Sequence, residues 1–474
     1  MEAGPITIGG HPMKKRSYRS VKVKAVDWEK LGEVVRGERV VFAIDVAKER
    51  LVGSVVLAST EEVRLNVSWE HPGESAEVAR LVTGLPALKL EVALEPSGTY
   101  GDPLRWLFLR RGVEVYRVSP KRSHDAAEVY DGVPSWHDVK SAGLIAKLHV
   151  HGASERWPLR SEGERELAAA VRTMGMYDKQ AQCNLSRLEA QLARHWPELT
   201  TVLDLVSATV LEVVKEYGTP EAVVREEEAA RRLMRRVGGA LLREEKVLAV
   251  VEGARRSIGV PATEGERRAM QELAAEILRC RAAGRRAKAV VKALVEGDEA
   301  AQRMGAVIGK TTAAVVISSV GDPRRFESAG ALEKAMGLNL KERSSGKHEG
   351  QLKITKRGPG ECRFYLYLAA LRLLMKDPVV AKWYERKVGR DGGKAKNKAV
   401  IAVTRKLAKA LWHVARGARF DATLLFDAVK LGFKPKVSSA PSPPRCAPES
   451  PGESSRASGL HSVGEVLQHA GLVQ

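Results

Sequence analysis

Two carboxylates end segments that have the composition of buried β-strands. Asp45 closes the run VVFAID at 40–45, and Glu95 closes KLEVALE at 89–95. A charge at the end of an interior strand is costly unless a cation or a hydrogen-bond network compensates it. These two positions are therefore candidates for a site that holds a cation.

A third carboxylate precedes an apolar pattern of helical period. Leu144, Ile145 and Leu148 share one helix face, which predicts a helix with Asp138 in its first turn. Oxygen ligands from the three acids would suit Mg²⁺, and such a site can activate one oxygen and stabilise the leaving one in phosphodiester displacement. The alternative is that each acid is a solvated strand end or a helix N-cap.

Five β-rich runs predict an α/β domain at 38–155. The runs are VVFAID (40–45), LVGSVVLA (51–58), VRLNVSW (63–69), KLEVALE (89–95) and VEVYRV (113–118). The first three follow one another, and the later ones alternate with the amphipathic stretches SAEVARLVTGL and YGDPLRWLFLRRG. This order predicts a mixed sheet with helices on its faces, as in a ribonuclease-H-like fold.

Strand signals stop after this domain. Residues 156–300 are expected to be helical, with Leu185, Leu188 and Leu192 on one stripe of a long helix that ends at Trp196. A helical hairpin or a coiled coil would bury such a stripe.

The remaining boundaries follow from composition. Residues 301–434 are expected to form a third, mainly helical domain. Residues 1–37 have little apolar periodicity and are expected to be a loose basic arm, and residues 435–474 a disordered tail rich in Pro and Ser.

The charge balance points to a polyanionic partner. The chain has 78 Lys and Arg against 58 Asp and Glu, a net charge of +20. Cations placed on phosphates release condensed counterions, so nucleic acid is the leading partner. The alternative is a merely soluble basic protein encoded by a GC-rich genome.

Cysteine spacing and hydropathy indicate the compartment. The four cysteines form no C-x-x-C pair, which argues against a zinc ribbon or a disulfide framework. No stretch of eighteen apolar residues occurs. We expect a cytoplasmic, nucleoid-associated protein without a membrane partner.

Taken together, the segments resemble a DEDD transposase of the bacterial insertion-sequence family one-ten. The residues that carry the resemblance are AIDVAKE, EPSGTYG, VSPKRSHDAAEVYDGVPSWHDVKSAGLIAKLH and GDPRRFESAGALEKAMGLNLKERSSGKHEGQLKITKRGPGECRFYLYLAALRL, in the family's order. The resemblance implies a RuvC-like domain, a coiled-coil region and a C-terminal transposase domain. It also implies DNA as the substrate, a structured guide RNA, and a homodimer or higher oligomer.

By this resemblance, Asp45, Glu95 and Asp138 are three of the family's four catalytic, metal-binding acids. The fourth falls on Ser141, whose hydroxyl supplies no charge, so binding of a second cation should weaken. Asp131 could substitute only if its loop folds back. The departure leaves a site that works with three acids, one that works poorly, or an inactive copy.

The same resemblance makes Ser345, in the sequence SSG, the nucleophile, with Ser344 as the alternative. Attack by a serine hydroxyl stores the phosphodiester energy in a seryl–phosphate link, so rejoining needs no ATP. An oxygen of the acid site could accept the proton of the serine. Without the family, SSG would be interpreted as a flexible loop.

Cations near this serine and on the last apolar helix are candidate nucleic-acid ligands. The first group is Arg343, Lys347, Lys353, Lys356 and Arg357, which could offset phosphate charge. In KAVIAVTRKLAKALWHVARG the apolar residues share one face, and Arg405, Lys406 and Lys409 lie on the opposite one. This pattern predicts a packed face and a basic strip.

The function predicted from these features is a DNA transposase or recombinase that joins strands through Ser345 and uses Mg²⁺ at the acids. A sugar or acetate kinase also begins with a strand ending in Asp, but its phosphate loop needs Gly-Thr or Gly-Ser next, and here Val46 follows. A RuvC-like junction nuclease and an inactive nucleic-acid-binding relic are also compatible with the sequence.

Overall fold

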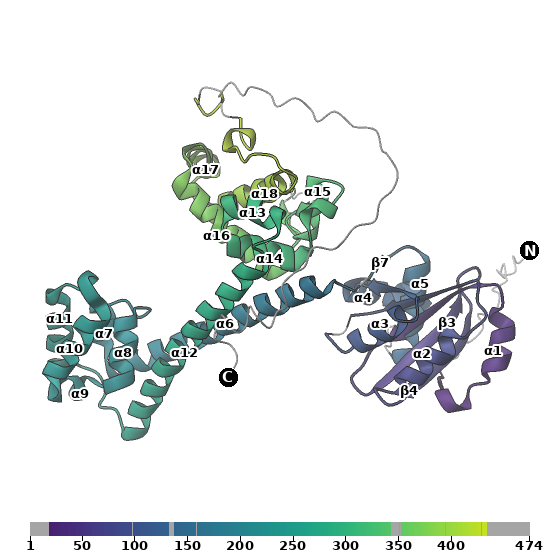
Figure 1. Ribbon diagram of the computed structural model, residues 1–474, viewed down its shortest axis with the longest axis horizontal. Coiled ribbons are helices and arrows are strands. Elements are labelled where there is room, and N and C mark those ends of the chain that lie inside the picture. The colour runs from purple at the N-terminus through teal and green to yellow at the C-terminus, as the bar shows by residue number, and fades with distance from the viewer. Residues whose placement is uncertain are drawn as a thin grey trace, which may run out of the picture. The chain divides into compact units, whose positions relative to one another are not determined.

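The computed structural model describes residues 19–96, 98–131, 137–157, 159–342, 350, 352–393, 395–427 and 429–433, with the backbone alone for 128–131. The predicted tail at 435–474 lies outside these residues. The chain forms two compact units, Met1–Arg160 and Ser161–Gln474, shown in Figure 1.

The first unit is a seven-stranded sheet with helices on both faces. Its strands are β1 (Val21–Lys22), β2 (Arg39–Asp45), β3 (Arg50–Leu57), β4 (Val63–Glu70), β5 (Lys89–Leu94), β6 (Glu114–Val118) and β7 (Ser154–Arg156). Its helices are η1 (Val23–Ala25), α1 (Trp28–Val35), α2 (Ser75–Thr83), α3 (Asp102–Leu109), α4 (Pro120–Asp131) and α5 (Asp138–Val150). The predicted α/β character and all five predicted strands are confirmed.

The strands have the order β1-β4-β3-β2-β5-β6-β7. The strands β2, β3 and β4 pair antiparallel, whereas β5 pairs parallel to β2 and β6 parallel to β5. β2 is therefore the central strand, and its uninterrupted apolar run reflects burial on both faces.

Alternating residues of β2 serve two different cores. Phe42 and Ile44 pack with residues of α1, α2 and α3, while Val41 and Ala43 pack against Ile145 of α5. Side chains of a strand alternate between faces, so Asp45 belongs to the α5 face, two residues beyond Ala43. Residues 21–35, assigned above to the loose arm, instead form β1, η1 and α1, because Leu31 and Val35 are buried in the first core.

The second unit begins with two long helices that run antiparallel. They are α6 (Glu162–His195) and α12 (Glu264–Leu294), each begun by a capping box. The start of α6 shares a core with the end of α12, through Val171 and Val291, and the end of α6 shares another with the start of α12, through Leu188 and Met270. The predicted long helix with its end at Trp196 is confirmed.

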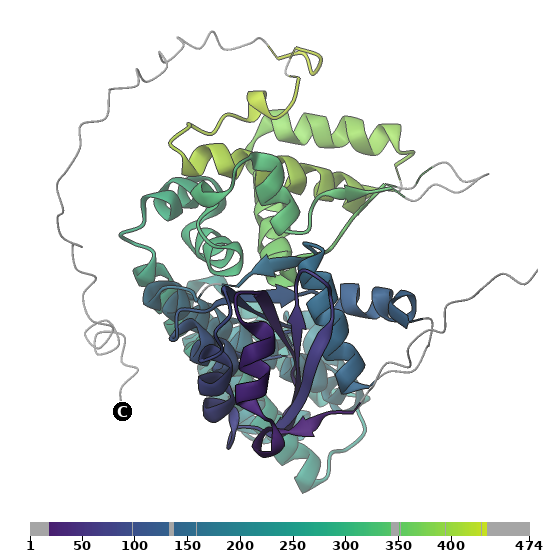
Figure 2. The same ribbon diagram turned by 90° about the vertical axis from the view of Figure 1, so that its right-hand side faces the viewer.

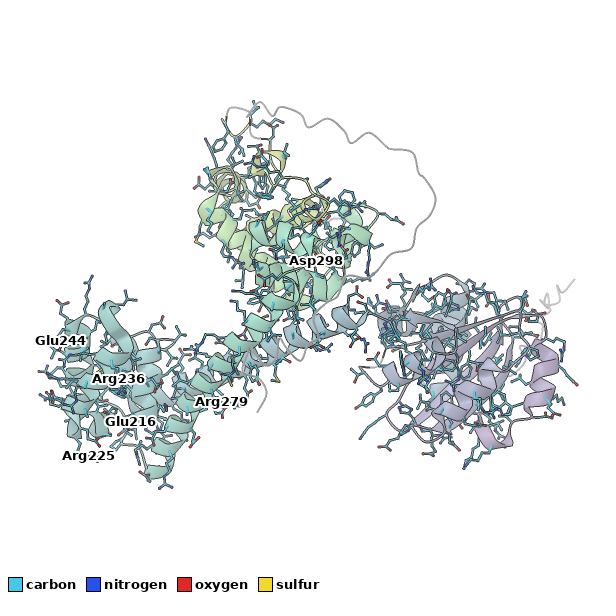
Figure 3. All side chains as sticks on the ribbon, in the orientation of Figure 1. Glu216, Arg225, Arg236, Glu244, Arg279 and Asp298 are labelled. Carbon is cyan, nitrogen blue, oxygen red and sulfur yellow. The ribbon has the colours of Figure 1, made fainter. Side chains whose placement is uncertain are left out.

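Five short helices between the long ones form a bundle at their far end. They are α7 (Pro197–Val202), α8 (Ala208–Tyr217), α9 (Pro220–Arg225), α10 (Glu227–Gly238) and α11 (Glu244–Arg255), with η2 (Gly239–Leu241). Charged side chains such as Arg225, Arg236 and Glu244 lie on the outside of the bundle (Figure 3). The apolar faces share one core around Trp196.

The C-terminal helices pack around the near end of the long pair. They are α13 (Glu299–Ile308), α14 (Lys310–Val320), η3 (Pro323–Arg325), α15 (Ala329–Ala335), α16 (Gly360–Lys376), α17 (Pro378–Arg390), α18 (Lys396–Ala415) and η4 (Ala422–Leu424). Asp298, labelled in Figure 3, caps α13 by accepting a hydrogen bond of 2.8 Å from Ala301 N. The helices α16, α17 and α18 lie together in Figures 1 and 2.

Two short strands, β8 (Leu340–Lys341) and β9 (Lys353–Ile354), pair antiparallel between α15 and α16. The helical character predicted for 156–300 and 301–434 is confirmed for the residues of these ranges that the structure describes. Within the described ranges, no helix is both long enough and apolar enough to cross a membrane.

Gly53 allows the ring of Phe42 to pack against the sheet. A Cβ at Gly53 would lie 2.6 Å from that ring and 3.1 Å from the ring of Trp69. Gly53→Ala should therefore destabilise the first unit by about 1–3 kcal/mol, which lowers its thermal midpoint by roughly 2–10 °C in a calorimeter. Gly73→Ala, whose Cβ would meet nothing within 4 Å, is the control. Equal midpoints for the two variants would contradict this packing.

Candidate active site

Parallel pairing of β2 with β5 brings two of the predicted acids together. The register pairs Ile44 with Leu94, so Asp45 and Glu95 are the next residues at the carboxyl ends of neighbouring strands. Ala43 and Ala93 both belong to the core under α5, and Asp45 and Glu95 each follow two residues later. Both side chains are half-buried.

The third acid comes from α5. Asp138 is the first residue of this helix and is exposed, and His137 caps the helix by accepting a hydrogen bond of 3.4 Å from Lys140 N at its ring nitrogen. α5 packs across β2 and β3 through Ile145 and Ala146. The helix predicted from apolar spacing, with Asp138 in its first turn, is confirmed.

The three acids interact through their charges. Burial, then the charges of Asp138 and Glu95, raise the pKa of Asp45 to about 6, while the nearby hydroxyl of Ser141 and the backbone N–H of Val46 oppose the rise. The carboxylate of Asp45 is therefore held in its charged form at neutral pH against an unfavourable environment. Asp138 and Glu95 are therefore near enough to Asp45 for their charges to act on it, and a shared metal-binding role of the three acids stays a prediction.

Ser141 lies one turn beyond Asp138 on α5 and is buried. Its hydroxyl lowers the pKa of Asp45 but makes no hydrogen bond of good geometry with any described residue. Ser141 thus lies beside Asp45 without adding charge. The side chain of Asp131, the alternative fourth acid, lies outside what the structure describes.

The acids have the chemistry for Mg²⁺ but not a finished coordination shell. Within the described ranges, no three side chains of Asp, Glu, His or Cys lie close enough together to hold a metal ion. The donors are hard carboxylate oxygens, and their mutual repulsion would be relieved by a divalent cation. The donor chemistry of these residues therefore fits Mg²⁺, whereas their spacing in this structure does not form a coordination shell.

A buried polar network holds the other end of α5. The carboxylate of Glu91, which is 2% exposed, accepts hydrogen bonds from Arg39 Nε at 2.8 Å and lies 2.8 Å from Lys89 Nζ and 3.4 Å from His149 Nε2. His149 and Asp138 are eleven residues apart, which puts them on the same helix face. The network therefore fixes the face of α5 that carries Asp138.

This network was not predicted from the sequence. The sequence does contain one signal for it, the glutamate inside the apolar run KLEVAL. An unpaired charge at such a position would be costly, so a buried partner was to be expected. Burial raises the pKa of Glu91, but its hydrogen bonds with Lys89 and Arg39 outweigh burial, and the net pKa is lowered. Burial lowers the pKa of His149, although Glu91 opposes this shift.

The predicted serine belongs to the connection between β8 and β9. Ser345, Ser344, Arg343 and Lys347 all lie outside the described residues. The strands on either side are held by the pairs Leu340–Ile354 and Lys341–Lys353. The serine segment therefore begins and ends at one antiparallel ladder.

Three predicted cations at this ladder are exposed: Lys353 lies in β9, and Lys356 and Arg357 follow it. Two backbone hydrogen bonds fix the turn that carries Lys356 and Arg357. Thr355 N donates to Asn339 O at 2.9 Å, and Lys356 N donates to Gly337 O at 3.0 Å. Lys356 has a φ of 57°, an unusual value for a residue with a side chain. The cations Lys356 and Arg357 therefore lie on a backbone that is fixed by hydrogen bonds, close in sequence to the serine segment.

The cations predicted on the last helix have intramolecular partners. Arg405 Nη2 lies 2.7 Å and Lys409 Nζ 3.2 Å from the carboxylate of the buried Glu333. Lys406 Nζ donates to Leu425 O at 2.7 Å. The apolar face of α18 is buried as predicted, through Val400, Val403, Leu407, Leu411 and Val414. The basic strip is thus partly structural, and contact of these cations with nucleic acid stays a prediction.

Comparison with known proteins gives a family and three relatives. Residues 306–385, from α13 to α17, match the model of the family described as Transposase IS116/IS110/IS902 family. The chain is 32% identical over 128 residues to the transposase for insertion sequence element IS1111A of Coxiella burnetii. It is 33% identical over 112 residues to the insertion element IS900 uncharacterized 42 kDa protein of Mycobacterium paratuberculosis.

The third relative is the insertion element IS110 uncharacterized 43.6 kDa protein of Streptomyces coelicolor. The identity is 24% over 343 residues, which is 70% of this chain and 80% of that protein. The first two matches cover 26% and 24% of this chain, and they span only 34% and 27% of the Coxiella and Mycobacterium proteins. The family match includes the segment between β8 and β9.

Asp45 should make the stability of the metal-free protein depend on pH. Its pKa is raised to about 6 from 3.8, so its ionisation opposes folding increasingly as pH rises from about 4 through 6. In EDTA, Asp45→Asn should raise the thermal midpoint by a few degrees at pH 8 and leave it nearly unchanged at pH 4, measured by scanning calorimetry. A shift of the same size at both pH values would contradict the repulsion among the acids.

Asp125→Asn is the matched control. Asp125 is exposed on α4, and its hydrogen bond with Lys121 lowers the pKa of the carboxyl. Because a lowered pKa contributes stability above that pKa, this variant should show no gain at pH 8.

Proposed function

We propose, from the chain's place in the IS116/IS110/IS902 family of transposases, that it is a transposase that cuts and rejoins DNA strands. The observation that carries this proposal is the register of β2 and β5, which puts Asp45 and Glu95 at neighbouring strand ends on the face covered by α5, the helix that begins at Asp138. Acids at neighbouring strand ends suit metal-assisted phosphodiester chemistry. The match of residues 306–385 to the transposase family model also supports the proposed function.

The first unit is proposed to be ribonuclease-H-like, or RuvC-like. Its central strands β4-β3-β2-β5-β6 have three antiparallel members followed by two parallel ones, which is the order expected from the sequence. Such a sheet exposes the carboxyl ends of β2 and β5 at one edge, and α5 covers the same face. This arrangement supports a site at Asp45 and Glu95.

Mg²⁺ is the proposed cofactor, held by Asp45, Glu95 and Asp138. When bound, it would supply positive charge for a phosphodiester in displacement. Asp45 is the ligand that would gain most from the cation in this proposal. Burial and the charges of the other two acids oppose its ionisation, and a bound cation would offset both. The hydroxyl of Ser141 lies beside Asp45 but contributes no charge to the proposed metal site.

Ser345 is the proposed nucleophile. Its Oγ forms a bond to phosphorus, the bond from phosphorus to a sugar oxygen breaks, the serine proton passes to a base, and the released sugar oxygen takes up a proton. The reverse attack by a sugar hydroxyl restores a phosphodiester and frees the serine. The added negative charge on the phosphate would be stabilised by Lys353 in β9 and by Lys356 and Arg357 on the constrained turn that follows.

The proposed partners are element-end and target DNA, a structured guide RNA and further copies of the chain. The net charge of +20 suits binding to phosphate backbones. A homodimer or higher oligomer would allow an acid site and a serine from different copies to act together. A chain that acts on bacterial DNA would work in the cytoplasm, at the nucleoid.

Trapping the covalent intermediate tests this function. Purified protein, Mg²⁺, the element's flanking RNA and radiolabelled end DNA should give a protein–DNA adduct that survives denaturing electrophoresis and is lost in Ser345→Ala. Ser344→Ala is the control and should keep the adduct, because only the serine before Gly346 matches the family's nucleophile.

Two results would change the proposal. An adduct that persists in Ser345→Ala and disappears in Ser344→Ala would move the nucleophile by one residue. Cleavage that survives both substitutions without any adduct would favour a RuvC-like nuclease that uses water.

Ser141→Asp tests the position of the missing acid. A carboxylate at this buried position should add to the repulsion at Asp45, so in EDTA at pH 8 the variant should melt several degrees below the wild type. Addition of Mg²⁺ should raise its midpoint more than that of the wild type or of Ser141→Asn. Equal Mg²⁺ shifts in all three proteins would place position 141 outside the metal site.

A further inference from the structure

A hollow lies beside the last helix of the second unit. Its volume is about 380 Å³, and it is lined by residues of α18 and of the segment that follows, 418–425. Small-molecule pockets range from about 300 to 1,000 Å³, so the hollow has room for a group of the size of one nucleotide. None of its lining residues belongs to the acid site or to the serine segment.

Three cations line this hollow. They are Lys406, Lys409 and Arg419. Lys406 and Lys409 have the partners described above, which hold their side chains in place at its wall. Arg419 is exposed and makes no hydrogen bond or ion pair with any residue that the structure describes. Its guanidinium is therefore available to an anion.

The one acid in the lining is already engaged. Asp421 Oδ1 accepts hydrogen bonds from Thr423 N at 2.8 Å and from Thr423 Oγ1 at 2.7 Å. Burial lowers the pKa of Lys406, and the positive charges of Lys409 and Arg405 lower it further, so these cations repel one another. An anionic group would relieve this repulsion.

The remaining wall is apolar and contains an aromatic ring. Phe420 is half-buried and lies next to Arg419, and Val414 and Leu425 also line the hollow. An aromatic face beside a cation is the combination that binds unpaired bases together with their phosphates. His413, exposed on the same helix, lines the hollow as well.

We propose that this hollow binds one unpaired nucleotide of a nucleic-acid strand, with its base against Phe420 and its phosphate on Arg419 and Lys409. The shared chemistry is a stacked base with an adjacent phosphate, which an RNA or a DNA strand can supply. The inference rests on the proposed function only in taking nucleic acid as the partner, and it requires no strand cleavage.

Binding of single strands to the full chain tests the site. Fluorescein-labelled U12 and dT12 are titrated in EDTA between 50 and 200 mM salt and followed by anisotropy. Arg419→Ala should weaken binding severalfold and reduce the slope of log K against log salt by about 0.7, the value for removal of one phosphate–cation pair from a single-strand complex. Phe420→Leu keeps the apolar volume and should weaken binding about fivefold or more.

Arg390→Ala is the matched control. Arg390 is an exposed arginine at the end of α17 that does not line the hollow. Its removal should leave the affinity nearly unchanged, and thermal unfolding checks that each variant is folded. The strand that loses more affinity in Arg419→Ala identifies the natural ligand as RNA or DNA.

Photocrosslinking locates the bound base. Strands containing 4-thiouridine or 4-thiothymidine should crosslink to the tryptic peptide that begins at Phe420. Crosslinks confined to other parts of the chain, or equal affinities for Arg419→Ala and Arg390→Ala, would overturn the site. Since EDTA prevents metal-dependent cleavage, this failure is distinct from a missing covalent adduct at Ser345.

Discussion

The parallel pairing of β2 with β5 is the constraint on which the acid site depends. One residue of slippage would turn Asp45 and Glu95 to opposite faces of the sheet, because side chains alternate along a strand. The register is held by burial on both sides, with Phe42 and Ile44 in one core and Val41 and Ala43 in the other. The apolar residues of β2 thus determine where its terminal charge lies.

The helix α5 adds the second half of this constraint. Its apolar face fixes its distance from the sheet, and the polar network at Glu91 and His149 fixes its rotation. Together they bring Asp138 toward Asp45, whose pKa is raised first by burial and then by the charges of Asp138 and Glu95. A divalent cation would relieve this repulsion, which is the physical reason for proposing a metal site here.

The sequence predicted the strands and the start of α5 well, because each depends on a local pattern of residues. Strand runs, the Gly-ended helices and the spacing of Leu144, Ile145 and Leu148 all depend on neighbours within a few residues. The network at Glu91 was not predictable in the same way, since its partners Arg39 and His149 come from segments 52 and 58 residues away. The folding of residues 21–35 onto the sheet was likewise decided by long-range packing of Leu31 and Val35.

The basic face of α18 shows why charge alone does not identify a binding surface. Its pattern of cations opposite an apolar face was correct, but Glu333 from α15 lies close enough to pair with two of the cations. A helix that packs into a domain through one face can still have its flanks used by neighbouring elements, and long cationic side chains then stabilise the fold. Arg419 differs because it lies beyond the end of α18, where none of the described acids pairs with it. Of the three cations that line the hollow, the one without a described intramolecular partner is therefore the one outside the regular helical pattern.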